Sequence, residues 1–189
     1  MVDLKSGIKT KILNGETNVY LSPLGTHTIW YKLDDSCYYS MHNKSNKIVN
    51  LTKKIHTPFY YELNDMPTDP YPYGVCGWSE DGKSIFIYDR YDIWKFDLAG
   101  KTPPINVTNG YGRTAKIKFR YIKLDNELVF IPEKAPILLK GFNEKTLQDG
   151  YYKTTLNLAK NPLVVSIGDY RYSAPLKAKN AESYVWRKQ

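Results

Sequence analysis

Cysteine is scarce in this chain, because only Cys37 and Cys76 occur among its 189 residues. Neither belongs to a C-x-x-C pair, so the usual zinc and redox motifs are absent. We expect two free, buried thiols, since a disulfide requires an exporting compartment and closely spaced Cα atoms. Long hydrophobic runs are also missing. No stretch of roughly 18 apolar residues predicts a membrane span, and residues 1–20 lack the apolar core of a signal peptide. The cellular compartment stays open.

Histidine is rare as well, with only His27, His42 and His56 in the chain. None forms an H-x-x-H or H-E-x-x-H pattern that would bring two ring nitrogens to one metal ion. Residues 62–69 are acidic, but they lack the D-x-D-x-D-G frame of a calcium-binding loop. The sequence therefore predicts no metal site and no cofactor.

A serine-hydrolase nucleophile is also missing. Residues 77–82 approach the G-x-S-x-G elbow, but the second glycine comes one residue late. The elbow requires a helix after the serine, whereas a strand-like run follows here. We therefore interpret Ser79 as a turn residue that binds neighbouring backbone N–H groups. No catalytic residue is predicted.

Basic residues outnumber acidic ones, giving a formal net charge of +8. Lysine and arginine are nevertheless scattered among acidic residues, which argues against nucleic-acid binding. The densest basic run, residues 115–121, alternates like a strand and places Lys116, Lys118 and Arg120 on one face. We interpret it as a half-buried strand with a solvated basic face. The alternative is a row of basic side chains that contacts the phosphates of a nucleic-acid backbone.

Aromatic residues and strand formers are abundant, with 17 tyrosines and a hydrophobic content of 42%. Around Asp81-Gly82, which favours a tight hairpin turn, one strand ends at Trp78 and another covers residues 84–88. Further strands are predicted at residues 93–97 and from residue 106. Four short strands joined by hairpins are the unit of a β-propeller blade.

The blade pattern recurs along the chain. Residues 48–52 (IVNLT) match residues 104–108 (PINVT), with the Asn and Thr identical and apolar residues at two further positions, and other strands repeat with a similar offset. We therefore predict an all-β fold, a partial β-propeller of about three four-stranded antiparallel blades, occupying residues 1–189. The predicted ranges are blades at 17–57, 74–110 and 134–170 and a partial blade at 180–189.

Two polar, proline-containing connections lengthen the repeat, at residues 53–74 and 110–136. Long loops between compact hairpins are often binding or interface elements. The alternative is that they are family-specific insertions without a binding or interface role.

Charged residues gather most tightly between the second and third strands of the middle blade. Asp89, Arg90 and Asp92 can form a local carboxylate–guanidinium network, with Tyr91 between them. Arg113 follows two glycines and can reach an aspartate or a ligand carboxylate. These residues predict either a loop-stabilising network or a contact for substrate or partner at one mouth of the propeller. The candidate contact residues are Asp89, Arg90, Tyr91 and Arg113.

Several motifs together resemble the N-terminal propeller of prolyl oligopeptidase-family serine peptidases, especially the bacterial acylaminoacyl- and dipeptidyl-peptidase-like members. The resemblance covers nearly the whole chain, and its most discriminating parts are YDRYDIW and NGYGR. The segments that carry it are GVCGWS (74–79), YDRYDIW (88–94), NGYGR (109–113), KGFNEKT (140–146) and KAKNA (177–181).

The resemblance implies a propeller of about seven or eight blades that caps an α/β-hydrolase domain carrying the catalytic triad. In such proteins the propeller restricts access, so that only short peptides reach the nucleophile. This chain would supply the non-catalytic propeller part, and its partners would be that hydrolase domain and short peptides. No catalytic residue can be carried over.

The main rival is a stand-alone propeller that binds proteins or glycans, as in TolB-like or WD-repeat modules. In either case a three-blade piece cannot close, so its first and last sheets should expose faces and edges. We therefore expect self-association, or a terminal segment around Trp186 that folds onto a sheet it would not normally join.

Overall fold

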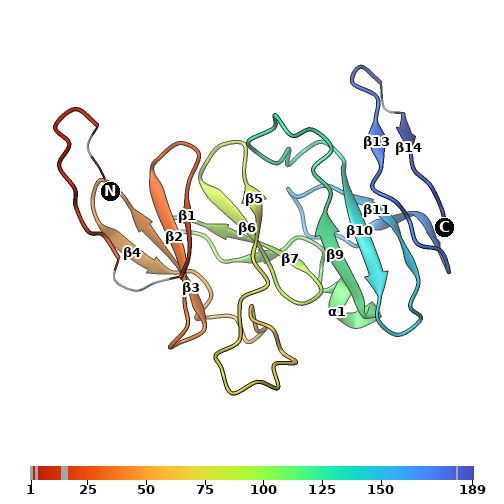
Figure 1. Cartoon of the computed structure of the whole chain (residues 1–189), viewed down its shortest axis with the longest axis horizontal. Helices are drawn as coiled ribbons and strands as arrows, with labels where there is room; N and C mark the ends of the chain where they lie inside the picture. Colours follow the sequence, from red (N-terminus) through yellow and green to blue (C-terminus); the bar gives the residue numbers. More distant parts are fainter. Residues whose placement is uncertain (1, 3, 14–16, 182) are drawn as a thin grey trace.

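The structure is a computed structural model that describes residues 2, 4–13, 17–181 and 183–189. Three four-stranded antiparallel sheets follow one another along the sequence, and within each the strands pair in chain order. Figure 1 shows them side by side, from the first sheet on the left to the third on the right. This is the architecture of an open, partial β-propeller, as predicted.

The first sheet is built from hairpins with short turns. Asn46 lies in the turn before the last strand with a φ of 56°, a left-handed conformation that asparagine tolerates better than most residues. Its strands are β1 (Thr17–Leu21), β2 (His27–Lys32), β3 (Cys37–His42) and β4 (Lys47–Asn50).

The second sheet has its four strands where the sequence predicts them. Gly82 has a φ of 66° in the hairpin turn. Ser79 is fully buried there; its Oγ donates to Asp81 Oδ1 at 2.7 Å and accepts the N–H of Ser84 at 2.9 Å. The interpretation of Ser79 as a turn residue is confirmed. The strands are β5 (Val75–Trp78), β6 (Ser84–Tyr88), β7 (Ile93–Asp97) and β8 (Ile105–Asn106).

The third sheet begins earlier than its predicted range of 134–170. Its first strand, β9 (Ile117–Tyr121), lies inside the segment interpreted as a connection and follows the short helix α1 (Tyr111–Ala115). β9 pairs with β10, which starts 16 residues after β9 ends, so alternation alone did not reveal its place in the blade. The other strands are β10 (Ile137–Asn143), β11 (Asp149–Thr154) and β12 (Leu163–Gly168).

The strand is half-buried as expected, but its basic face is solvated only in part. Lys116 precedes β9 as the left-handed C-cap of α1. Lys118 forms an ion pair with Glu144 at 2.5 Å, and the Arg120 guanidinium lies 4.6 Å from the centre of the Tyr88 ring. Burial lowers the pKa of Arg120. The Arg120 side chain therefore contacts the second sheet, whereas Lys118 pairs with Glu144 within the third sheet.

The sheets pack face to face, and every side chain of β6 is buried because neighbours cover both faces. Ile85 and Ile87 point into a cluster shared with the first sheet. Phe86 and Tyr88 point into a cluster shared with the third sheet. The first cluster includes Ile29, Tyr31, Tyr38 and Phe96, and the second includes Ile93, Phe119, Leu139 and Tyr152.

Both tryptophans of the second sheet contact the cluster that it shares with the first. Trp78 is 9% exposed and belongs to that cluster. Trp94 is only half-buried, and its ring lies edge-on to Phe59 with centroids 6.0 Å apart. Its Nε1 donates to Asp89 Oδ2 at 2.9 Å, which requires the polar edge of the ring to lie near the loop.

The end of the chain folds back onto the third sheet. β13 (Leu176–Lys177) pairs with β14 (Tyr184–Val185), so a two-stranded hairpin stands where a partial blade was predicted. Figure 1 shows it at the right of the molecule. Trp186 is half-buried, edge-on to Tyr151 with centroids 5.4 Å apart. The C-terminal segment thus covers part of the face that a next blade would occupy.

The connection at residues 53–74 extends below the sheets in Figure 1 and is anchored at its base. Its arms run antiparallel, with the Tyr61 N–H donating to Tyr71 O at 2.8 Å and the Tyr73 N–H donating to Phe59 O at 2.9 Å. Both cysteines are free, as expected, but each is half-buried rather than buried. In the part of the chain that the structure describes, no helix is long and apolar enough to cross a membrane.

Candidate functional site

Asp89 organises the loop between β6 and β7. Its side chain is almost fully buried, and Oδ1 accepts the N–H groups of Tyr91 at 2.6 Å and Asp92 at 2.8 Å. The other oxygen accepts the indole N–H of Trp94. A carboxylate that accepts several N–H groups within four residues of itself holds a tight turn, because it replaces the backbone acceptors that the turn lacks.

Asp92 connects this loop to α1. Its Oδ1 accepts the Thr108 hydroxyl at 2.7 Å and the Gly112 N–H at 2.9 Å, and its Oδ2 accepts the Arg113 N–H at 3.0 Å. Burial raises the pKa of Asp92, and the nearby Asp89 carboxylate raises it further, against the lowering effect of these hydrogen bonds. Asp92 therefore acts as a buried acceptor that positions the start of the helix.

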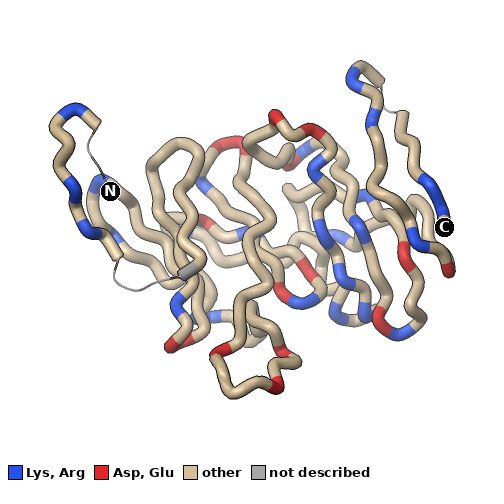
Figure 2. Tube along the Cα trace, in the orientation of Figure 1, with Lys and Arg blue, Asp and Glu red and all other residues tan. Residues whose placement is uncertain are grey.

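Arg113 links the second sheet to the connection at residues 53–74. Its Nη1 lies 3.0 Å from Glu62 Oε1, and its Nη2 lies 3.6 Å from Asp89 Oδ1. Figure 2 shows acidic positions gathered on the connection below the sheets. Glu62 belongs to the acidic loop at residues 62–69, most of which is exposed, and it alone among the acidic residues of this loop forms an ion pair with another described residue. Sequence offered no signal for it beyond the opposite charges, because the two residues lie 51 positions apart.

Arg90 and Tyr91 point to a different partner, Glu144, in the turn after β10. Arg90 Nη2 donates to Glu144 Oε2 at 2.8 Å, and the Tyr91 hydroxyl donates to the same oxygen at 2.7 Å. Burial raises the pKa of Glu144, but hydrogen bonds from Lys118, Tyr91 and Arg90 outweigh it and lower the pKa to about 2. Glu144 thus joins the second and third sheets as a permanent carboxylate.

Tyr91 lies at the centre of these contacts and is 4% exposed. Three cations surround its ring: Arg90, Arg113 and Lys116, each about 5 Å from the centroid. Burial and the hydrogen bond to Glu144 raise the pKa of the Tyr91 hydroxyl to about 12. The hydroxyl therefore stays protonated and serves as a hydrogen-bond donor. We call the connected set the ion-pair network; its members are Glu62, Asp89, Arg90, Tyr91, Asp92, Arg113, Lys118 and Glu144.

No protein-family model matches this chain, and no curated protein matches it.

The four candidate contact residues thus divide into two pairs. Asp89 and Arg113 contact each other and line a cavity of about 600 Å³ together with Trp94 and Asn109. Arg90 and Tyr91 do not line it and are joined instead through Glu144. The polar atoms at the cavity wall are largely engaged with protein partners, including Asn109, whose Nδ2 donates to Asn161 Oδ1 at 2.9 Å, and the half-buried Trp94 ring supplies an apolar surface.

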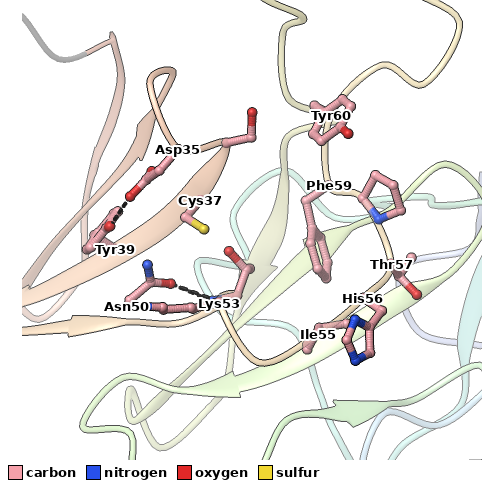
Figure 3. Close-up of a pocket in the computed structure, with 13 residues that line it drawn as sticks. Asp35, Cys37, Tyr39, Asn50, Lys53, Ile55, His56, Thr57, Phe59 and Tyr60 are labelled. Atoms are coloured by element: carbon pink, nitrogen blue, oxygen red, sulfur yellow. Dashed lines mark hydrogen bonds between the residues drawn. The ribbon is translucent and has the colours of Figure 1, made fainter.

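A second cavity, of about 500 Å³, separates the first sheet from the connection. Figure 3 shows Cys37, Asp35 and Tyr39 on the sheet side, facing Phe59 and His56 on the connection. The Tyr39 hydroxyl donates to Asp35, and Asn50 Oδ1 accepts the Lys53 N–H at 2.9 Å. Its polar groups therefore stabilise local turns.

One serine–histidine contact was missed by sequence reasoning. His42 Nδ1 lies 3.0 Å from Ser45 Oγ, and it also faces the Ser45 N–H at 3.2 Å. Both contacts close the turn between β3 and β4, and neither residue is buried. Among the described residues, no group of three or more histidine, cysteine, aspartate or glutamate side chains could hold a metal ion.

Proposed function

We propose that this chain is the non-catalytic propeller part of a prolyl oligopeptidase-like serine peptidase and restricts substrate access to a hydrolase domain. The observation that carries the proposal is the serial packing of three four-stranded meanders, the middle one covered on both faces. Sheets stacked in this way build a propeller, and a propeller placed over an active site admits only substrates that fit its opening. The YDRYDIW and NGYGR motifs favour this family over other propellers.

The use of the polar residues supports a non-catalytic role. Ser79 is buried in its turn, and its hydroxyl donates a hydrogen bond to the Asp81 carboxylate. Most charged groups of the ion-pair network hold one sheet or loop against another, as Arg113 does with Glu62 and Arg90 with Glu144. Such contacts hold the sheets and loops in position, as the opening of a propeller requires. They are not arranged as catalytic groups.

The second candidate is a stand-alone binding module. The cavity beside Trp94 favours it, because a half-buried aromatic ring next to charged groups is a common feature of binding sites. The two candidates differ in what the gene encodes beyond Gln189. A peptidase requires further blades and a G-x-S-x-G elbow in the same reading frame, whereas a stop codon directly after Gln189 would overturn the peptidase proposal and favour the binding module.

A biochemical test uses the purified chain with chromogenic aminoacyl and dipeptidyl substrates. We expect no turnover, and Ser79→Ala should behave like the wild type. Turnover by the wild type that Ser79→Ala abolishes would contradict the non-catalytic role. Ser45→Ala is the matched control for the serine–histidine contact and should also leave the chain without activity.

A further inference from the structure

The last strand of the third sheet is an unprotected edge. β12 pairs with β11 on one side and ends the sheet on the other. Apolar side chains along it are exposed: Leu163 by 60%, Val164 by 55%, Val165 by 41% and Ile167 by 37%. Successive strand residues point to opposite faces, so both faces and the outer edge meet solvent at Leu163–Val165, whereas Ser166 is half-buried with its hydroxyl 3.0 Å from the Tyr172 hydroxyl.

The corresponding strands of the other two sheets carry protection that β12 lacks. β4 begins with Lys47, a charged residue of the kind that discourages edge pairing. β8 is only two residues long, too short to offer a long edge for pairing. β12 is six residues long, and although Pro162 directly precedes it, residues 163–168 themselves contain neither a charge nor a proline. Their one irregularity is a bulge at Val165, between the pairs Tyr151–Ser166 and Tyr152–Val164.

The charges that flank β12 specify what can pair with it. Lys160 precedes the strand and Asp169 follows it; both are exposed, and neither forms an ion pair with another described residue. In an antiparallel pair of two copies centred between Val164 and Val165, Lys160 of each copy lies opposite Asp169 of the other. A parallel pair would place like charges together. The strand is therefore complementary to itself in the antiparallel direction.

We propose that β12 pairs antiparallel with β12 of a second copy of this chain. The contact joins two four-stranded sheets into one continuous sheet, pairs the free backbone edge of β12 and reduces the exposure of its valines. It lies on the outer strand of a blade, so it does not depend on whether the propeller serves a peptidase or a binding module.

Sedimentation velocity of the purified chain over a wide concentration range tests the proposal. We expect a monomer–dimer equilibrium that Val164→Lys abolishes, because it places a charge on the paired edge. Ile48→Lys is the matched control: Ile48 is also 55% exposed, but it lies on β4. It should dimerise like the wild type. Unchanged thermal unfolding would show that both variants fold.

Charge exchange tests the direction of pairing. Lys160→Asp and Asp169→Lys should each weaken the dimer, and the double variant should restore it, since it reverses both charge pairs. A wild type that stays monomeric throughout, or a Val164→Lys variant that dimerises as well as Ile48→Lys, would overturn the proposal. Single variants that weaken the dimer without recovery in the double variant would overturn the antiparallel arrangement.

Discussion

Replacing Glu144 by glutamine should weaken the contact between the second and third sheets, and the loss should depend on pH. The carboxylate accepts hydrogen bonds from Arg90 at 2.8 Å and Tyr91 at 2.7 Å and pairs with Lys118 at 2.5 Å. Glutamine keeps the size of the side chain but removes its charge. The two cations then lose the group that neutralises them at a partly buried site.

The pKa of Glu144 sets the size of the effect. It falls from an ordinary 4.5 to about 2 in the folded protein. At about 1.4 kcal/mol per pKa unit this corresponds to roughly 3 kcal/mol. Because the side chain is 20% exposed, solvent screening reduces the contribution, and we expect about 2 kcal/mol. A carboxylate whose pKa is lowered by folding stabilises the protein above its unfolded-state pKa, and this contribution disappears as the pH falls from about 4.5 toward about 2.

Urea unfolding followed by tryptophan fluorescence measures this contribution. The free energy of unfolding of Glu144→Gln should lie below that of the wild type near neutral pH, and the difference should shrink as the pH falls below about 4.5 and vanish toward about 2. Glu127→Gln serves as the control, because Glu127 is exposed and forms no ion pair with the described residues. A difference that stays constant with pH, or an equal loss in the control, would refute the reasoning.

Two further predictions concern other contacts. A Cβ at Gly112 would lie 2.8 Å from Asp92 Oδ1 and from the carbonyl oxygens of Tyr91 and Ile117. Gly112→Ala should therefore lower the free energy of unfolding by about 2–3 kcal/mol, and an unchanged urea midpoint would contradict this packing. Burial lowers the pKa of His27 and His42 lowers it further, against the effect of Asp97. Protonation of His27 therefore opposes folding, and Tm should fall as the pH drops below about 6.5. His27→Gln should reduce that fall, and an equal fall in the variant would show that other groups cause it.

Much of the fold could be predicted because its signals are local. Asp81-Gly82 favours a hairpin turn, and the alternating residues that follow favour a strand, whatever the rest of the chain does. The same turn-and-strand unit recurs, which indicated blades before any contact between them was known. The boundary error at β9 arose where the signal was not local: its partner β10 starts 16 residues after β9 ends.

The candidate site was predicted only in part, for the same reason. The loop at residues 88–92 showed its density of charge, and Asp89 and Arg113 do contact each other. Glu62 and Glu144, which complete the network, lie more than 50 positions from their arginines. Acidic and basic residues are frequent throughout this sequence. Nothing in the sequence therefore indicated that Glu62 and Glu144, rather than other acidic residues, would pair with these arginines.

The sequence by itself determined that the chain forms short antiparallel hairpins, where they turn, and that they repeat as blades. Only the tertiary structure decided which charges meet, that the half-buried Arg120 lies over Tyr88, and that the last residues fold back over the third sheet. The physical reason is range: turn geometry and strand alternation act over a few residues, whereas ion pairing and burial depend on which sheets become neighbours.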